Sequence, residues 1–171
     1  MSTLRATLNE VHDPQARSQV CDKVLRELPE WFGIETAIID YVHDVSDMSF
    51  CSAAVDGEPI GFVALKDHNP STSEIHVMGI LREYHRRGIG KQLVSWCQQR
   101  CQQSGREYLT VKTLDESRVN QDYASTRQFY TSVGFRPLEV FADLWGAENP
   151  CLMMVKHVCC FASPPTAPQA S

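Results

Sequence analysis

The chain has 171 residues, of which 43% are apolar and 22% are charged. A soluble domain of this length buries a substantial core and needs no disulfide or metal to fold. The formal net charge of −5 argues against a nucleic-acid partner, for which a basic face is expected. No apolar run approaches the ~18 residues of a membrane span, and the first residues lack the apolar stretch of a signal peptide. We therefore expect a cytoplasmic protein without a membrane partner.

The seven cysteines are irregularly spaced, and the sequence contains no Cys-x-x-Cys pair. This pattern predicts free thiols in a reducing compartment, with no disulfide framework and no metal site. Cys97 and Cys101 are four residues apart, which places them on one face of a helix, and we expect them in the core.

In chain order the sequence predicts helices over residues 14–31 and 34–45, strands over 50–55, 58–68 and 73–81, a helix that ends at Gly105, a strand over 106–115, a helix over 123–133, and strands over 135–141 and 151–158. Asp56-Gly57 between two apolar runs predicts the turn of a hairpin. The order implies an α/β (α+β) fold, a mixed sheet with helices on both faces. Residues 1–158 then form a single domain, and residues 159–171, with three prolines and no charge, are expected to be a disordered tail.

The glycine-rich stretch after the third strand has the features of an anion-binding site. Gly88 and Gly90 allow a sharp turn and leave no Cβ to block a phosphate. The first amides of the following helix have no internal partner, and the helix dipole adds positive charge there. Arg86, Arg87 and Lys91 can add charge-assisted hydrogen bonds. A glycine pair alone is equally compatible with a plain turn that has a solvated basic rim.

The segment HRRGIG at residues 85–90 resembles the acyl-coenzyme A signature of the GNAT superfamily of N-acetyltransferases, Gln/Arg-x-x-Gly-x-Gly/Ala. His85 stands where Gln or Arg is usual. The segment FYTSVGF at residues 129–135 resembles the superfamily's Phe/Tyr-Tyr-x-x-x-Gly-Phe motif. The resemblance covers roughly residues 50–158. It implies a mostly antiparallel central sheet of about six or seven strands, with one strand pair splayed for the cofactor.

The resemblance also implies that acetyl-coenzyme A is the acyl donor and that the amides of residues 85–91 hold its pyrophosphate. The edge of the third strand would pair with the pantetheine arm, with the Ile80 amide as oxyanion donor, and Gly79 would mark the bulge that opens the strand. Superfamily members commonly have an Asn where this chain has Tyr123, which we expect to line the same groove. The expected cofactor contacts are Met78, Ile80, Arg82, His85, Arg86, Arg87, Gly88, Ile89, Gly90, Lys91 and Tyr123.

Strand alternation predicts that every second residue from Glu74 to Ile80, including His76, points to one face. Glu74 lies fourteen residues before Gly88, which is the offset of the catalytic glutamate in the histone-acetylating branch of the superfamily. Glu74 is therefore the first candidate for the general base and His76 the second. The resemblance implies that Tyr130 is the general acid for the departing thiolate. The structural alternatives are a solvated carboxylate, a hydrogen-bonded histidine and a core aromatic residue.

The acceptor is expected to meet the N-terminal helices, at about residues 14–45, which would act as a cap, and the later strands. The candidate substrate-binding residues are Trp31, Phe32 and Trp145, with Asp40, Tyr41 and Glu148 beside them. The leading hypothesis is an N-acetyltransferase for a small-molecule primary amine that attacks directly in a ternary complex. The alternatives are a protein lysine or N-terminal acetyltransferase, and a non-catalytic acyl-coenzyme A-binding module. A homodimer is expected by analogy with the superfamily.

Overall fold

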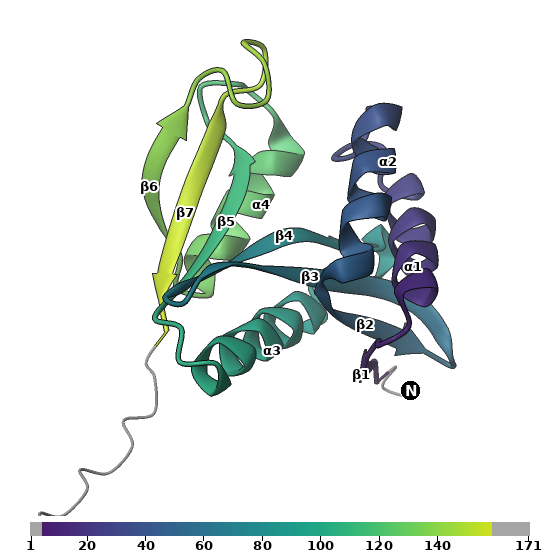
Figure 1. The fold of residues 1–171 in the computed structure, drawn as a ribbon. Coiled ribbons are helices and arrows are strands. Elements are labelled where there is room, and N and C mark those ends of the chain that lie inside the picture. The colour runs from purple at the N-terminus through teal and green to yellow at the C-terminus, as the bar shows by residue number, and fades with distance from the viewer. Residues whose placement is uncertain (1–4, 159–171) are drawn as a thin grey trace, which may run out of the picture.

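The computed structural model describes residues 5–158 (Figure 1). The strands are β1 (Thr7–Glu10), β2 (Ser49–Val55), β3 (Glu58–Asn69), β4 (Thr72–Ile80), β5 (Tyr108–Leu114), β6 (Arg136–Phe141) and β7 (Cys151–His157). The helices are α1 (Pro14–Arg26), α2 (Glu35–Asp44), α3 (Ile89–Gln103) and α4 (Gln121–Ser132), with 3-10 turns η1 (Val45–Asp47) and η2 (Arg82–Tyr84). The predicted tail, residues 159–171, lies outside the described residues.

The predicted order of elements is confirmed, with one addition. The sequence pattern did not predict β1, because it is a four-residue edge strand in which only Leu8 is partly buried, and so short a strand has no alternation to detect. Helix α1 ends at Arg26, five residues before the predicted end, and α2 is one residue shorter at each end than predicted. Asp13 caps α1 by accepting a hydrogen bond from the Ala16 amide at 2.9 Å, and Pro14 occupies the first helical position.

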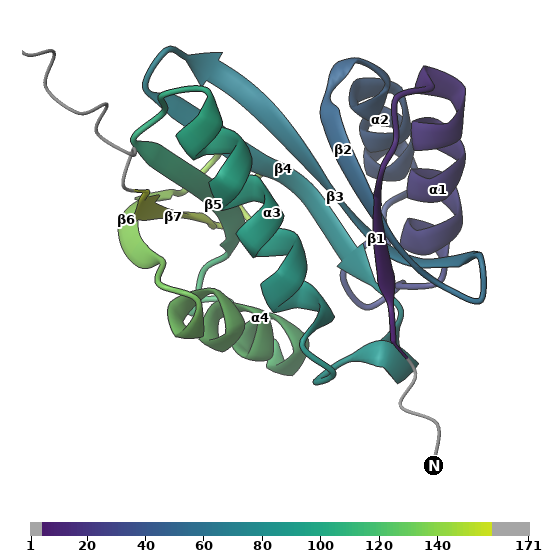
Figure 2. The same cartoon turned by 90° about the horizontal axis from the view of Figure 1, so that it is seen from below.

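In the described part of the chain, the strands form a seven-stranded sheet with the order β1-β2-β3-β4-β5-β7-β6. All neighbouring strands are antiparallel except β4 and β5, which are parallel. Helices α1 and α2 cover one face of the sheet, and α3 covers the other, with α4 beside it (Figure 1, Figure 2). The mixed, mostly antiparallel α/β fold predicted from the sequence is therefore confirmed.

Strands β4 and β5 separate halfway along their length. Their ladder extends only from the Thr72–Tyr108 pair to the Ile75–Val111 pair, although both strands continue well beyond it. The continuation of β5 pairs with β7 on its other side, up to Leu114. The splayed strand pair that the resemblance implied is therefore present.

The bulge in β4 lies at His76 and not at Gly79, which corrects the prediction. Adjacent residues of β3 pair with Ile75 and Val77, so His76 is an extra residue in the strand. Gly79 has a packing role instead. A Cβ atom at this position would lie 3.1 Å from the side chains of Val24 in α1 and of Leu28 just after it, so the glycine lets this helix approach the sheet.

The bulge also breaks the alternation predicted for β4. His76 contacts the ring of Tyr41 in α2, on the face that α1 and α2 cover. The Ile80 side chain lies beside Gly90 at the start of α3, on the other face. The prediction that every second residue from Glu74 to Ile80 points to one face is wrong, because the extra residue reverses the direction of the side chains that follow it.

The hydrophobic core lies on both faces of the sheet. Phe50 and Phe62 stack with their ring centroids 5.1 Å apart. Cys97 and Cys101 of α3 are fully buried, as predicted. Within residues 5–158, no helix has both the length and the apolar character needed to cross a bilayer. In the same residues, no three His, Cys, Asp or Glu side chains are arranged to hold a metal ion.

Candidate functional site

The loop between η2 and α3 has the geometry of an anion cradle. Gly88 is the N-cap of α3 with a φ of 79°, and no atom lies within 4 Å of the position that a Cβ would take. Arg86 also has a positive φ, of 59°. The first bond within α3 runs from the Gln92 amide to the Gly88 carbonyl, so the three amides before Gln92 have no helical partner. No side chain of the described residues caps them. This arrangement suits a phosphate group.

The side chains around this loop have different roles. The predicted basic residues Arg86, Arg87 and Lys91 are exposed, and the Arg87 guanidinium lies 5.5 Å from the centroid of the Tyr84 ring. Gly90 makes room for α4, since a Cβ there would lie 2.9 Å from the Phe129 ring. Ile89 is buried in the core and anchors the start of α3.

His85 does not offer its amide to the cradle, which corrects the prediction that all amides of residues 85–91 are available. This amide donates to the Arg82 carbonyl at 3.1 Å. The His85 ring nitrogen Nε2 lies 2.7 Å from the Ile80 carbonyl, and it must carry the proton because a carbonyl only accepts. The ring therefore ties the loop to the end of β4.

The edge of β4 beyond its separation from β5 presents backbone polar groups to the gap. The Leu81 amide donates to the Ile60 carbonyl of β3 at 2.9 Å. Every second residue of an antiparallel strand bonds the same neighbour, so the backbone groups of Met78 and Ile80 face away from β3. The bond between His85 and the Ile80 carbonyl agrees with this orientation. An extended arm between the two strands can thus pair with both amides.

Thr113 of β5 adds a second sign that a polar group belongs in this region. The residue is 2% exposed, and its hydroxyl has no hydrogen-bond partner among the described residues. Buried hydroxyl groups without a partner are rare in native proteins. Thr113 lies on the stretch of β5 that no longer pairs with β4. The residues present therefore fit a phosphate held at the start of α3 and a polar arm between the strands.

A network of side chains joins the α1–α2 loop, η2 and the start of α4. The Tyr123 hydroxyl donates to the Trp31 carbonyl at 2.9 Å, and the Trp31 indole donates to the Thr126 hydroxyl at 3.1 Å. The Arg82 guanidinium lies 5.1 Å from the centroid of the Trp31 ring and pairs with Asp122 at 3.0 Å. Three residues predicted for ligand contacts therefore contact one another in this structure.

A hollow of about 250 Å³ lies beside the bulge in β4, on the face covered by α2. Its lining residues are Tyr41, Lys66, His68, Glu74, His76, Lys112, Leu144 and Trp145. The hollow brings together both candidate bases and Trp145. Phe32 contributes indirectly, since its ring packs edge-to-face on Tyr41 with centroids 5.9 Å apart. Trp31, Asp40 and Glu148 are not part of the lining.

Four residues that line this hollow were not predicted from the sequence: Lys66, His68, Lys112 and Leu144. The first two occupy alternate positions of β3, and Lys112 lies on β5. Strand alternation indicates which residues of one strand share a face, but only the pairing of β3, β4 and β5 shows that these three faces meet.

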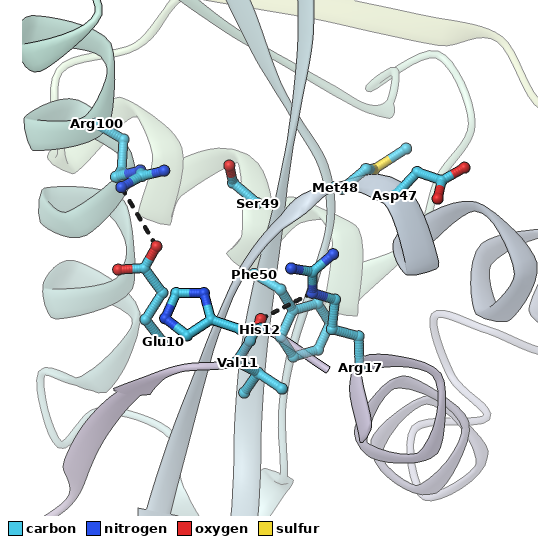
Figure 3. Close-up of a pocket in the computed structure, with 9 residues that line it drawn as sticks. All are labelled: Glu10, Val11, His12, Arg17, Asp47, Met48, Ser49, Phe50 and Arg100. Carbon is cyan, nitrogen blue, oxygen red and sulfur yellow. Dashed lines mark hydrogen bonds and ion pairs between the residues drawn. The ribbon is translucent and has the colours of Figure 1, made fainter. Parts of the chain in front are cut away.

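A larger hollow, of about 310 Å³, lies at the β1 edge of the sheet (Figure 3). Its lining residues are Glu10, Val11, His12, Arg17, Asp47, Met48, Ser49, Phe50 and Arg100. Both arginines are engaged there: Arg100 pairs with Glu10 at 3.3 Å, and Arg17 donates to the Val11 and Ser46 carbonyls at 2.8 Å. This hollow is remote from the cradle and from the splayed strands.

A family comparison accounts for the combination of cradle and splayed strands. The model of the acetyltransferase (GNAT) family matches residues 8–135. The chain belongs to this family. It is therefore an acetyltransferase, and its acyl donor is acetyl-coenzyme A. No curated protein matches the chain in sequence.

Solved structures agree with this family in fold. A protein of Desulfovibrio desulfuricans assigned to the GNAT family has a TM-score of 0.76 and 16% identity, covering 91% of this chain and 100% of its own. An aminoglycoside 6'-N-acetyltransferase complexed with coenzyme A has a TM-score of 0.71 and 16% identity, covering 92% and 99%. The ribosomal-protein-S18-alanine N-acetyltransferase from Escherichia coli has a TM-score of 0.71 and 11% identity, covering 95% and 99%. One of these enzymes is named for a small-molecule acceptor and another for a protein acceptor.

Glu74, the first candidate for the base of this acetyltransferase, is buried and paired. Its Oε2 accepts from His68 at 2.6 Å and from Lys112 at 2.7 Å, and its Oε1 accepts from Lys112 at 2.9 Å. Burial is the largest single effect and acts to raise the pKa of Glu74, but the hydrogen bonds and charges of Lys112 and His68 together outweigh it, and the pKa is lowered. Glu74 is therefore a carboxylate at neutral pH with both oxygens engaged.

His76, the second candidate, is better placed to accept a proton. Its Nε2 lies 3.0 Å from Asp44 Oδ2, so this nitrogen carries the proton and Nδ1 remains as the acceptor. Burial lowers the pKa of His76 from 6.5, although the hydrogen bond and charge of Asp44 act to raise it. The Tyr41 ring packs edge-to-face on the imidazole with centroids 5.4 Å apart. A neutral imidazole in the hollow is suited to act as a base.

Tyr130, the candidate acid, is 6% exposed and packs between Phe129 and Phe135. Burial raises the pKa of its hydroxyl far above the neutral range, so the phenol keeps its proton. A protonated phenol is what the departing thiolate requires, and a core aromatic residue would show the same burial.

The substitution Tyr130→Phe separates these two roles. The ring volume is kept, so the free energy of unfolding should change by less than about 1.5 kcal/mol. An acid role predicts that kcat falls roughly 100-fold, because general acid catalysis contributes on this scale. Thiol release and thermal unfolding measure the two quantities. A variant with unchanged turnover would remove Tyr130 as the acid.

Proposed function

We propose that this enzyme transfers the acetyl group of acetyl-coenzyme A to the primary amine of a small molecule, by direct attack in a ternary complex. The observation that carries the proposal is the small hollow beside His76, of about 250 Å³. It adjoins the stretch of β4 whose amides face the gap between the strands. Trp145 and Leu144 from the β6–β7 loop line it, which favours a small acceptor over a long peptide.

In this proposal, His76 accepts the proton of the attacking amine at Nδ1 while Asp44 holds the ring through Nε2. An alkyl amine has a pKa of about 10.4, so its neutral form costs roughly 5 kcal/mol at pH 7. Acetyl-coenzyme A supplies an activated acyl group when bound. The amides of Met78 and Ile80 are the donors available to stabilise charge on its carbonyl oxygen. Tyr130 gives its proton to the leaving sulfur.

Glu74 has a positioning role in this scheme rather than that of the base. Its carboxylate holds Lys112 and His68 around the hollow. Helices α1 and α2 form the acceptor-side cap of a domain that spans residues 1–158, and α2 provides Tyr41 and Asp44.

A screen of acceptors tests the proposal. Wild-type protein with acetyl-coenzyme A is assayed against a panel of small primary amines and against peptides that offer a lysine or a free N-terminus. We expect a small amine to have the highest kcat/KM, measured by thiol release and confirmed by the mass of the acetylated product. Transfer to peptides alone would contradict the proposal in favour of a protein acceptor. Binding of acetyl-coenzyme A without any transfer would indicate an acyl-coenzyme A-binding module.

A further inference from the structure

The charges that line the hollow beside His76 are not those of a site for a polycation. The lining contains two lysines, two histidines and one carboxylate. Both oxygens of this carboxylate, in Glu74, are bonded to Lys112 or His68 at 2.6–2.9 Å. A cationic acceptor is bound best by carboxylates that have no other partner. Among the residues that line the hollow, no carboxylate meets this requirement.

Asp44, outside the lining, has one oxygen engaged by the base. Its Oδ2 bonds His76 at 3.0 Å, and its Oδ1 lies 3.7 Å from His43 Nδ1. Asp40 and Glu148, which the sequence placed beside the candidate substrate-binding residues, are exposed and do not line the hollow.

Lys66 is the lining charge that remains available to a ligand. It lies on β3 directly across from Glu74 and is exposed. It forms no ion pair within residues 5–158, whereas Lys112 lies 2.7 Å from Glu74. Burial lowers the pKa of His76, and the charge of Lys66 acts in the same direction, which places Lys66 within electrostatic reach of the base.

The remaining walls limit the size of the acceptor. Tyr41, Leu144 and Trp145 supply aromatic and apolar surface. A volume of about 250 Å³ is slightly below the range of about 300–1,000 Å³ that is usual for small-molecule sites. The hollow therefore suits an acceptor of few heavy atoms, with an anionic group at Lys66 and an apolar or short aliphatic body.

We propose that the acceptor is a small amine that also carries a carboxylate, such as an amino acid. Lys66 binds this carboxylate by a charge-assisted hydrogen bond, and His76 faces the amine. This inference rests on the proposed function, because it names the acceptor class of the same site.

The test uses acceptor pairs that differ only by a carboxylate or a carboxamide. Values of kcat and KM are measured for the wild-type enzyme, for Lys66→Met and for Lys66→Glu. The amines of the two members of a pair differ in reactivity. This difference is the same for every enzyme, so it cancels when the carboxylate-to-carboxamide ratio of kcat/KM in a variant is compared with the ratio in wild type. We expect the carboxylate-to-carboxamide ratio to fall roughly tenfold in Lys66→Met, mainly through KM, and further in Lys66→Glu.

Lys23→Met is the matched control. Lys23 is an exposed residue of α1 that pairs with Glu58 at 2.8 Å and does not line the hollow, so its removal should leave the ratio at the wild-type value. An unchanged ratio in Lys66→Met, with small amines still acetylated, overturns the inference and leaves the proposed function standing. A wild-type preference for polyamines over amino-carboxylates also overturns the inference and leaves the proposed function standing. Absence of transfer to any small amine overturns both.

Discussion

Gly88→Asp is expected to abolish the binding of acetyl-coenzyme A. Gly88 is the N-cap of α3, directly before the amides that have no helical partner. An aspartate at this position would add bulk and negative charge, and its carboxylate would compete with a phosphate for the same amides. We expect the affinity to fall on the order of 100-fold or more. Calorimetric titration with acetyl-coenzyme A measures this loss.

Gly105→Asp is the matched control for this experiment. Gly105 has a φ of 70° and Gly88 a φ of 79°, and neither has an atom within 4 Å of its Cβ position. Both substitutions therefore impose a similar backbone cost, of about 1 kcal/mol, and thermal unfolding checks that both variants are folded. Gly105 follows the opposite end of α3, so its variant should bind normally. Equal affinity in the two variants would show that the pyrophosphate assignment is wrong.

The second large effect is expected for His76→Gln, which should lower kcat/KM about 100-fold or more by removing the base. In the wild-type enzyme the imidazole must be neutral to accept a proton. Burial lowers the pKa of His76 from 6.5, so kcat/KM should fall with decreasing pH through a limb centred below 6.5. This limb should be absent from the pH–rate profile of His76→Gln.

The variant Asp44→Asn tests whether the fall of kcat/KM at low pH, the acidic limb of the profile, reports the protonation of His76. Burial lowers the pKa of His76, while the hydrogen bond and the charge of Asp44 raise it. Removing that charge should lower the pKa further and shift the limb to lower pH. Glu74→Gln provides the opposing test. If Glu74 were the base, its variant would lose the limb, higher pH would partly restore the rate, and His76→Gln would retain the limb.

The cofactor side of the site could be predicted from the sequence because its signals are local. Gly88 must adopt a positive φ at a helix start, and the structure places it there with a φ of 79°. The helix that follows leaves its first amides without partners whatever the rest of the fold does. The prediction failed for the amide of His85, because its bond to the Arg82 carbonyl depends on the 3-10 turn η2, which the sequence did not indicate.

The residues around the hollow beside His76 were predicted less well. Glu74, His76 and Trp145 were named and do line one hollow, but Lys66, His68 and Lys112 were not. Glu74 ranked first as the base because of its offset from the glycine turn. Its engagement by a lysine from β5 and a histidine from β3 depends on the pairing of three strands. No pattern within a single strand contains that information.

By itself the sequence determined the order of the elements after β1 and the glycine turn with its open helix start, and its resemblance to the GNAT signature implied the use of acetyl-coenzyme A. These features depend on backbone conformation and on periodicity over a few neighbouring residues. Only the tertiary structure decided where the bulge falls, which side chains around the hollow already have hydrogen-bond partners, and which charges line it. The reason is that a pKa and an unpaired charge depend on burial and on partners far apart in the chain. Asp44 and His76, for example, are 32 residues apart in the chain and 3.0 Å apart in space.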